Sequence, residues 1–128
     1  MSFAWAEYLA LAEALFRERA TFANEEACCR AAISRAYYAA FCAARNYARD
    51  NEGLALRNTA RDHQIVFGHY DQGPSAQHRA IGWDLGQLRQ RRNQADYDDS
   101  NIHRADALAQ NALQQARQVF TALRILGP

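Results

Sequence analysis

Apolar residues recur every three or four positions along most of the chain, a spacing that places them on one face of an α-helix. The first such segment covers about residues 2–20, and its apolar face consists of Trp5, Tyr8, Leu9, Ala12, Leu15 and Phe16. A longer segment begins at Asn24, whose side chain is a good helix cap, and continues to about Arg49. Turn-forming residues at 50–53 predict its end.

Three further helices are predicted in the second half of the chain. A short one ends at the break formed by Gly73 and Pro74, and one of its faces consists of His63, Val66, Phe67 and Tyr70. Ser75 is placed to cap the next helix, over about 76–95, whose inward stripe consists of Ile81, Leu85, Leu88, Arg92 and Ala95. The last helix has apolar residues in regular succession from Ala105 to Leu123 and ends at Gly127 and Pro128. With no strand-like alternation, this pattern predicts one all-α domain over 1–128, an up-and-down bundle of four to five helices.

The amino-acid composition supports this interpretation and indicates which helix lies at the centre. The chain contains 27 Ala, the residue with the lowest cost of helix formation. In the longest segment the recurring positions are Ile33, Tyr37, Ala40, Ala44 and Tyr47. Because small alanine side chains let another helix approach closely, we expect this segment to lie at the centre of the bundle.

Charge and cysteine content limit the function classes. The chain has 15 Arg and no Lys against 14 acidic residues, a net charge of +1, which argues against a protein that binds nucleic acid by bulk electrostatics but leaves room for a local basic patch. Cys28, Cys29 and Cys42 have neither zinc-binding nor redox spacing, so we expect reduced thiols in a cytoplasmic protein. Glu7 and Glu13 interrupt the apolar N-terminal segment, so neither a signal peptide nor a membrane span is predicted.

Arg92 is the charged exception on the inward stripe of the fourth predicted helix. One account is structural: the side chain reaches solvent or pairs with Asp96, its neighbour at i,i+4. The other is functional: a guanidinium held in a cleft binds phosphate through paired hydrogen bonds. Arg89 and Arg91 lie beside it in the sequence and could add positive charge. The residues alone leave both accounts open.

Four segments of the chain occur in an order that is typical of a known protein family. They are SRAYYAAFCAA at 34–44, RDHQIVF at 61–67, LRQRRNQADYDD at 88–99, and an Ala-rich last helix. This order resembles the HEPN domain family, and most closely its small stand-alone prokaryotic members with an R-x-x-A-D-Y motif. The resemblance implies a four- or five-helix bundle that forms a homodimer and is encoded beside a minimal nucleotidyltransferase in a toxin–antitoxin-like pair.

The resemblance also implies an active motif for metal-independent ribonucleases: an Arg followed by a polar residue, and a His separated from the Arg by four to six residues. Arg92 and Asn93 match its start, but Tyr97, Asp98 and Asp99 occupy the positions where the His is expected. Tyrosine, with an ordinary pKa of about 10, is a poor proton acceptor at neutral pH. The candidate catalytic residues are therefore Arg92 with Tyr97 or a His from elsewhere, and we expect phosphate binding to survive this replacement better than catalysis.

The candidate nucleotide- or RNA-binding residues all lie within these motifs. They are Arg92, Asn93, Asp96, Arg89, Arg35, Tyr38 and His63. Asp96 could orient Arg92, while Arg35 and Tyr38 lie off the apolar stripe and could reach a cleft or a dimer partner. His63 could either pack in the core or face the cleft, and Tyr37, on the stripe, is expected in the core. Arg57 and His63 also fit the Arg-x5-His spacing, but such a match arises by chance in so Arg-rich a chain.

Two functions of different classes follow. The first is a HEPN-family protein whose cleft around Arg92 engages RNA or nucleotide phosphates, with endoribonuclease activity as its enzymatic form. The second is a noncatalytic nucleotide- or partner-binding module that acts with the nucleotidyltransferase. No cofactor is expected, and no metal site either, because the four histidines are scattered along the chain. A dimeric bundle without a ligand also stays open.

Overall fold

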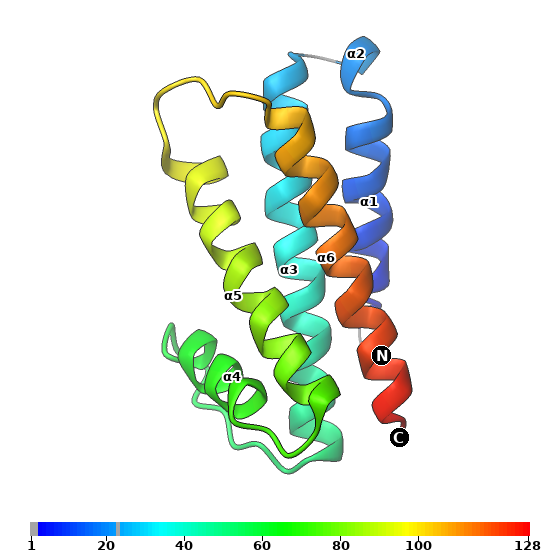
Figure 1. Ribbon diagram of the computed structural model, residues 1–128, viewed down its shortest axis with the longest axis vertical. Helices are drawn as coiled ribbons and strands as arrows, with labels where there is room; N and C mark the ends of the chain where they lie inside the picture. Colours follow the sequence, from blue (N-terminus) through cyan, green and yellow to red (C-terminus); the bar gives the residue numbers. More distant parts are fainter. Residues whose placement is uncertain (1–2, 23) are drawn as a thin grey trace.

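The computed structural model describes residues 3–22 and 24–128, and the regular structure in these residues is entirely helical (Figure 1). The helices are α1 (Ala6–Arg17), α2 (Arg19–Phe22), α3 (Glu25–Asn51), α4 (Asp62–Asp71), α5 (Ala76–Tyr97) and α6 (Ala105–Leu126). The predicted all-α bundle is confirmed. The four long helices α1, α3, α5 and α6 alternate in direction, as an up-and-down bundle requires.

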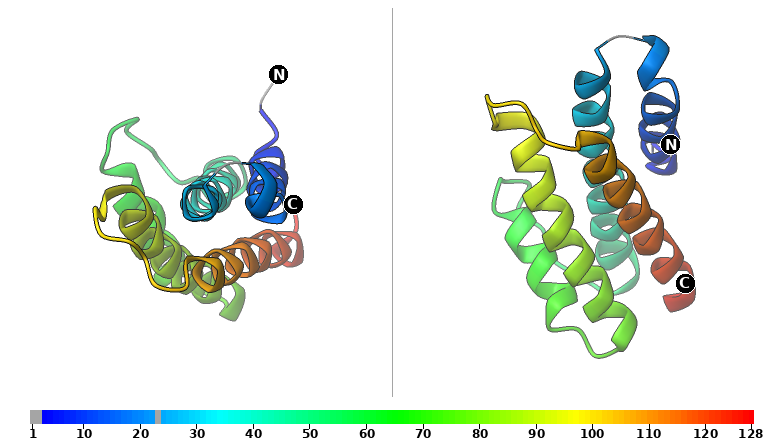
Figure 2. Two further views of the ribbon diagram at one scale, coloured as in Figure 1. Left: turned by 90° about the horizontal axis from the view of Figure 1, so that it is seen from above. Right: turned by 45° about the horizontal axis from the view of Figure 1, so that its top comes forward.

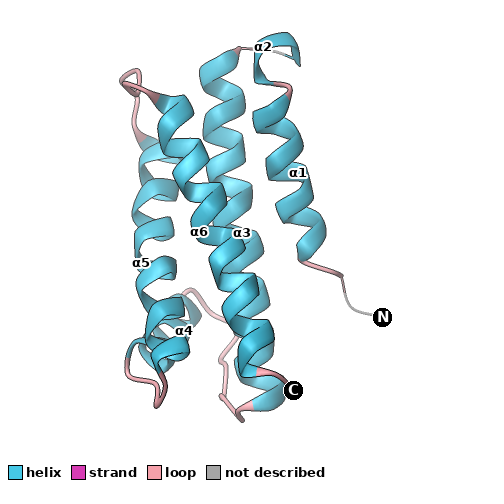
Figure 3. Ribbon diagram, turned by 45° about the vertical axis from the view of Figure 1, so that its right-hand side comes forward, coloured by secondary structure: helices cyan, strands magenta, loops and turns pink. Residues whose placement is uncertain are grey.

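Helix α3 lies at the centre of the bundle, as its alanine-rich face predicts. It packs against α1, α5 and α6, and α4 lies against one end of α5 (Figure 2). Buried alanines recur along α3 at positions 32, 36, 40, 44 and 48, and their small side chains let the neighbouring helices approach closely. The loop between α5 and α6 lies at one end of the bundle, and the loop between α4 and α5 lies at the other (Figure 3).

The bounds of α3 follow from its terminal residues. The Asn24 side chain accepts a hydrogen bond of 2.9 Å from the backbone N–H of Ala27, which satisfies one of the free donors of the first turn. The helix continues two residues past the expected Arg49, to Asn51. Gly53 follows with a φ of +69°, a left-handed conformation that glycine adopts at low cost.

The first helical segment differs from the prediction of one helix over 2–20. Helix α1 ends at Arg17, and a separate turn, α2, follows. The Arg19 side chain folds back to donate to the carbonyl oxygen of Phe16 at 2.9 Å and lies over its ring, which satisfies a free carbonyl of the last turn. The described residues thus form six helices rather than four to five. Residue 2 of the expected helix lies outside the described residues.

Helix α5 buries the whole stripe predicted for it, including Arg92. Arg30 of α3 holds the loop that follows α5, since its guanidinium donates to the carbonyl oxygens of Ala95, Asp98 and Ser100 at 2.6–3.1 Å. These bonds fix the C-terminal end of α5 against α3. The contact between α3 and α5 that surrounds Arg92 is therefore anchored at this end.

Other expectations have mixed outcomes. The three cysteines are buried free thiols. On α4, Val66 and Tyr70 are buried as predicted, but Phe67 is 38% exposed. None of the described helices combines the length and apolar character needed to cross a lipid bilayer.

Candidate functional site

The side chain of Arg92 is surrounded by tyrosines. The residue is only 9% exposed, and its guanidinium carbon lies 5.2 Å from the ring centre of Tyr37, 5.5 Å from that of Tyr38 and 6.0 Å from that of Tyr97. Aromatic faces attract a cation in this way. Two of the rings come from adjacent residues of α3 and the third from the last residue of α5, so the packing of α5 on α3 builds the enclosure.

Arg92 has almost no polar partner within residues 3–22 and 24–128. Its Nη1 lies 3.9 Å from Oδ2 of Asp96, a loose ion pair, and its Nε is buried without a hydrogen-bond partner. Asp96 itself accepts from the Ser34 hydroxyl at 3.3 Å. A buried N–H without a partner is costly, and more so when it belongs to a charged group. The i,i+4 pairing expected for a purely structural Arg92 is therefore incomplete.

His63 reaches the same region from α4. Its Nδ1 lies 2.5 Å from the Tyr37 hydroxyl, and its ring stacks on Phe41 with centres 4.2 Å apart and planes at 8°. Burial lowers the pKa of His63, and the nearby cations Arg89 and Arg92 lower it further. Burial raises the pKa of the Tyr37 hydroxyl. At neutral pH the pair is therefore an uncharged imidazole beside a protonated phenol.

Arg89, one turn before Arg92, lines a hollow of about 100 Å³ between α3, α4 and α5. We call this the aromatic hollow; its lining includes Tyr37, Phe41, His63, Phe67, Gly86 and Arg89. We call Tyr37, His63, Arg89 and Arg92 together the Arg92 cluster. Tyr37 contacts Arg92 with its ring and the uncharged imidazole of His63 with its hydroxyl, and Arg89 lines the adjoining hollow.

The residues predicted for the site have different surroundings. Tyr38, Asp96 and Tyr97 meet Arg92, and Tyr97 is otherwise 73% exposed. Asn93 is exposed. Arg35 lies over the ring of Tyr8 on α1, with its guanidinium carbon 5.5 Å from the ring centre.

Sequence reasoning left the orientation of His63 open and placed Tyr37 in the core. Tyr37 is indeed buried, at 2% exposure, but its hydroxyl also contacts His63. Phe41, which supports the His63 ring, was not predicted as part of a site. No spacing signal links these residues, because they meet only when α4 packs beside α3.

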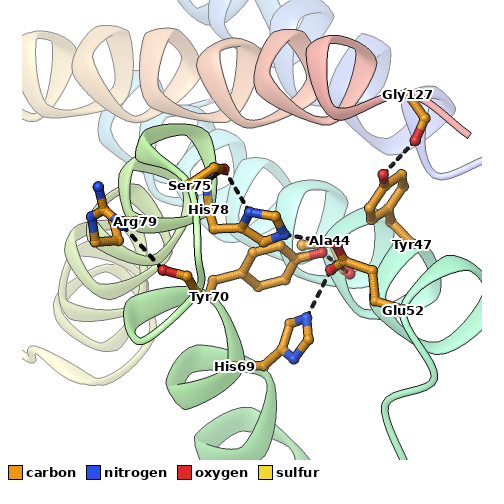
Figure 4. Close-up of polar contacts among 10 residues, drawn as sticks. Ala44, Tyr47, Glu52, His69, Tyr70, Ser75, His78, Arg79 and Gly127 are labelled. Atoms are coloured by element: carbon orange, nitrogen blue, oxygen red, sulfur yellow. Dashed lines mark hydrogen bonds and ion pairs between the residues drawn. The ribbon is translucent and has the colours of Figure 1, made fainter.

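A second group of polar side chains lies at the opposite end of α5 (Figure 4). Glu52 accepts from Nε2 of His69 at 2.8 Å and from Nε2 of His78 at 2.6 Å, and Nδ1 of His78 lies 2.6 Å from the Ser75 hydroxyl oxygen. Partial burial acts to raise the pKa of the Glu52 carboxyl, but the hydrogen bonds from the two histidines outweigh it and the pKa is lowered.

The Glu52 group joins the end of α3 to α4 and to the start of α5. Both nitrogens of the buried His78 ring have partners, in contrast to Arg92. Sequence reasoning missed this group because its histidines are scattered in sequence. Within the described part of the chain, no three His, Cys, Asp or Glu side chains are arranged to hold a metal ion. We interpret the group as a structural link.

A third polar group lies between α5 and α6, beside an open groove of about 540 Å³. Asp84 is buried, and the Gln115 amide donates to it at 3.4 Å while also accepting from Nε of Arg91 at 3.1 Å. Burial raises the pKa of Asp84, although the hydrogen bond from Gln115 acts in the opposite direction. The side chains of this group hydrogen-bond to one another, so the groove lacks an unsatisfied donor like the one at Arg92.

Comparison with known proteins adds no assignment: no family model matches the chain, and no curated protein or solved structure is detectably similar to it. The Arg92 cluster itself is therefore the feature of the molecule that points to a function.

Proposed function

We propose that this protein binds phosphate groups of RNA or nucleotides at the Arg92 cluster. The observation that carries the proposal is the buried Nε of Arg92, an ionised donor without a partner among the described residues. Nε itself is covered, so phosphate oxygens would bond to the Nη atoms of the same guanidinium, whose nearest acceptor, Asp96, lies 3.9 Å away. The planar guanidinium suits such paired hydrogen bonds. Arg89 adds a second cation.

The site fits local recognition by a chain that is almost neutral overall. With a net charge of +1, general attraction to nucleic acid is weak. Two arginines on adjacent turns of α5 create positive potential at one place instead. The resemblance to HEPN proteins supports the same location, because Arg92 and Asn93 match the start of their motif.

His63 favours a second function at the same site, cleavage of the bound RNA. In the tautomer whose Nδ1–H donates to the Tyr37 hydroxyl oxygen, Nε2 has a free lone pair. His63 Nε2 would take the proton of a ribose 2′-hydroxyl as that oxygen attacks the adjacent phosphorus. The P–O5′ bond breaks, and the 5′ oxygen leaves with a proton returned by His63. The products are a 2′,3′-cyclic phosphate and a 5′-hydroxyl, while Arg92 stabilises the charge on the phosphoryl oxygens.

A matched pair of variants tests binding. Arg92→Gln and Arg91→Gln each remove one charge from the same helix, but Arg91 faces Gln115 rather than the tyrosines. For a short single-stranded RNA, Arg92→Gln should weaken binding about tenfold and reduce the salt dependence, whereas Arg91→Gln should change affinity less than about twofold. Equal effects of the two variants would contradict the proposed site. Circular dichroism and sedimentation establish that both variants keep the fold and oligomeric state.

Cleavage is tested on the same RNA in EDTA, with product ends identified by mass. We expect a 2′,3′-cyclic phosphate from the wild type and at least about a hundredfold slower cleavage by His63→Gln, whose binding should remain. Binding without cleavage by the wild type would leave the noncatalytic function as the proposal. Co-expression with a neighbouring nucleotidyltransferase, followed by co-purification, then tests the partner that the HEPN resemblance implies; sedimentation tests the homodimer.

A further inference from the structure

The aromatic hollow has the composition of a site for a flat ring. The rings of Tyr37, Phe41 and His63 lie within 8–19° of parallel with one another. Phe67, also in the lining, is 38% exposed although it is a large apolar side chain. Tyr37 and Phe41 are 2% and 5% exposed, so the rings that a ligand can reach are the half-buried His63 and the exposed Phe67. Exposed aromatic side chains stack on nucleic acid bases, and every base has a face for such stacking.

The hollow also offers polar groups at its edge. Gln64 contributes an amide with both donors and an acceptor, and Arg89 contributes a cation. A hydrocarbon would leave these groups unpaired, whereas the edge of a nucleobase carries both donors and acceptors. Arg89 lies on the same face of α5 as Arg92, so a ring in the hollow would have its attached phosphate within the Arg92 cluster.

Gly86 lets the Phe67 ring pack closely against α5 at the wall of the hollow. A glycine inside a helix weakens it, and this one adopts no left-handed conformation that would require glycine. A Cβ at this position would lie 3.1 Å from Cε2 of Phe67, so any larger side chain would displace that ring and enter the hollow.

From these features we infer that the aromatic hollow holds the base of a pyrimidine nucleotide whose phosphate lies at the Arg92 cluster, an inference that rests on the proposed function. Pockets for whole small ligands usually measure about 300–1,000 Å³. A hollow of about 100 Å³ lies well below this range and suits one six-membered ring better than the two fused rings of a purine. The sugar and phosphate would then lie outside the hollow.

Binding of five probes to the wild-type protein tests the inference without any substitution. They are CMP, UMP, AMP, GMP and ribose 5-phosphate, titrated by calorimetry at one salt concentration. We expect CMP and UMP to bind about tenfold more tightly than the other three, because only a ring that enters the hollow gains the stacking contacts. AMP or GMP binding as tightly as the pyrimidine nucleotides would overturn the inference.

Two glycine variants test where the base lies. Gly86→Leu fills the hollow, while Gly68→Leu places the same side chain on α4 where no atom lies within 4 Å of the new Cβ. Gly86→Leu should bind CMP only as tightly as ribose 5-phosphate, and Gly68→Leu should keep the wild-type preference. An unchanged CMP preference in Gly86→Leu would overturn the inference. Should this variant fail to fold, Phe67→Ala, which removes an exposed ring, should reduce the preference at least about threefold; an unchanged preference there would also overturn it.

Failure of the inference is distinguishable from failure of the proposed function. If ribose 5-phosphate binds and Arg92→Gln weakens it while all four nucleotides bind equally, the phosphate site stands and the base site is wrong. If no probe binds, or if Arg92→Gln binds all of them as the wild type does, both are wrong.

Discussion

The guanidinium of Arg92 lies over the ring of Tyr37, with its carbon 5.2 Å from the ring centre. The hydroxyl of the same tyrosine contacts His63. Tyr37 therefore packs its ring face against a cation and directs its hydroxyl to an imidazole. Because its raised pKa keeps the hydroxyl protonated, Tyr37 adds no negative charge beside Arg92. The positive potential at Arg92 is thus preserved for an outside anion.

Replacing Arg92 by methionine should separate function from stability. Methionine loses the attraction to the tyrosine rings, which is worth about 2 kcal/mol where the cation is desolvated, as it is here. It also removes the buried unpartnered Nε, whose desolvation costs about 1–3 kcal/mol. Urea unfolding should give a free energy within about 1 kcal/mol of the wild type, while RNA affinity falls about tenfold. A loss of stability above about 3 kcal/mol would show that Arg92 is chiefly structural.

His63 should make stability depend on pH below about 6.5. Its folded-state pKa is lowered from 6.5, so as pH falls below 6.5 the unfolded state takes up a proton first and the folded state loses stability. The loss ends once pH is below the folded-state pKa. In His63→Gln this part of the pH dependence should disappear, as measured by urea unfolding between pH 5 and 8. An identical pH profile for the variant would contradict the lowered pKa.

Glu52 should also make stability depend on pH, in a lower pH range than His63 does. Its folded-state pKa is lowered from 4.5, so the stability that it supplies is fully present above 4.5 and is lost as pH falls through the folded value. At pH 6, Glu52→Gln should reduce the unfolding free energy by about 1–2 kcal/mol, because His69 and His78 lose a charged acceptor. The difference from the wild type should shrink below pH 4.5. A constant difference down to pH 3 would mean that the carboxylate charge contributes nothing.

Removing the charge of Asp84 should raise the stability of the fold, whereas removing that of Glu52 should lower it. Burial raises its pKa, so its ionised form is disfavoured in the folded state at neutral pH. Asp84→Asn keeps an acceptor for the Gln115 amide and removes the buried charge. Thermal unfolding at pH 7 should show the variant to be more stable by about 1 kcal/mol. This advantage should decline as pH is lowered toward 4, since the wild-type carboxyl then becomes protonated.

Two substitutions at Tyr97 distinguish its ring from its hydroxyl. The ring is near Arg92, with the guanidinium carbon 6.0 Å from its centre. If His63 transfers the proton, Tyr97→Phe should cleave RNA within about twofold of the wild-type rate, while Tyr97→Ala should bind RNA about threefold more weakly because one cation–π contact is lost. A large loss of cleavage in Tyr97→Phe would instead assign the proton transfer to the Tyr97 hydroxyl.

Local patterns in the sequence predicted most of the helices and the position of the unusual charge. Helical periodicity and capping residues such as Asn24 and Ser75 are local, and both cap as predicted. The same periodicity placed Arg92 on the buried stripe, where it lies. The break after Arg17 was missed, because it depends on a side chain folding back on its own helix.

The surroundings of Arg92, by contrast, depend on how the helices pack against one another. The contacts with Tyr37 and Tyr38, and the contact of His63 with Tyr37, depend on how α4 and α5 rotate and cross against α3. Periodicity fixes which face of a helix is buried, but it leaves open which residue of a neighbouring helix lies opposite. The meeting of His69 and His78 on Glu52 has the same origin. The same packing, through α4, brings His63 beside Tyr37, a contact that no spacing along the chain predicts.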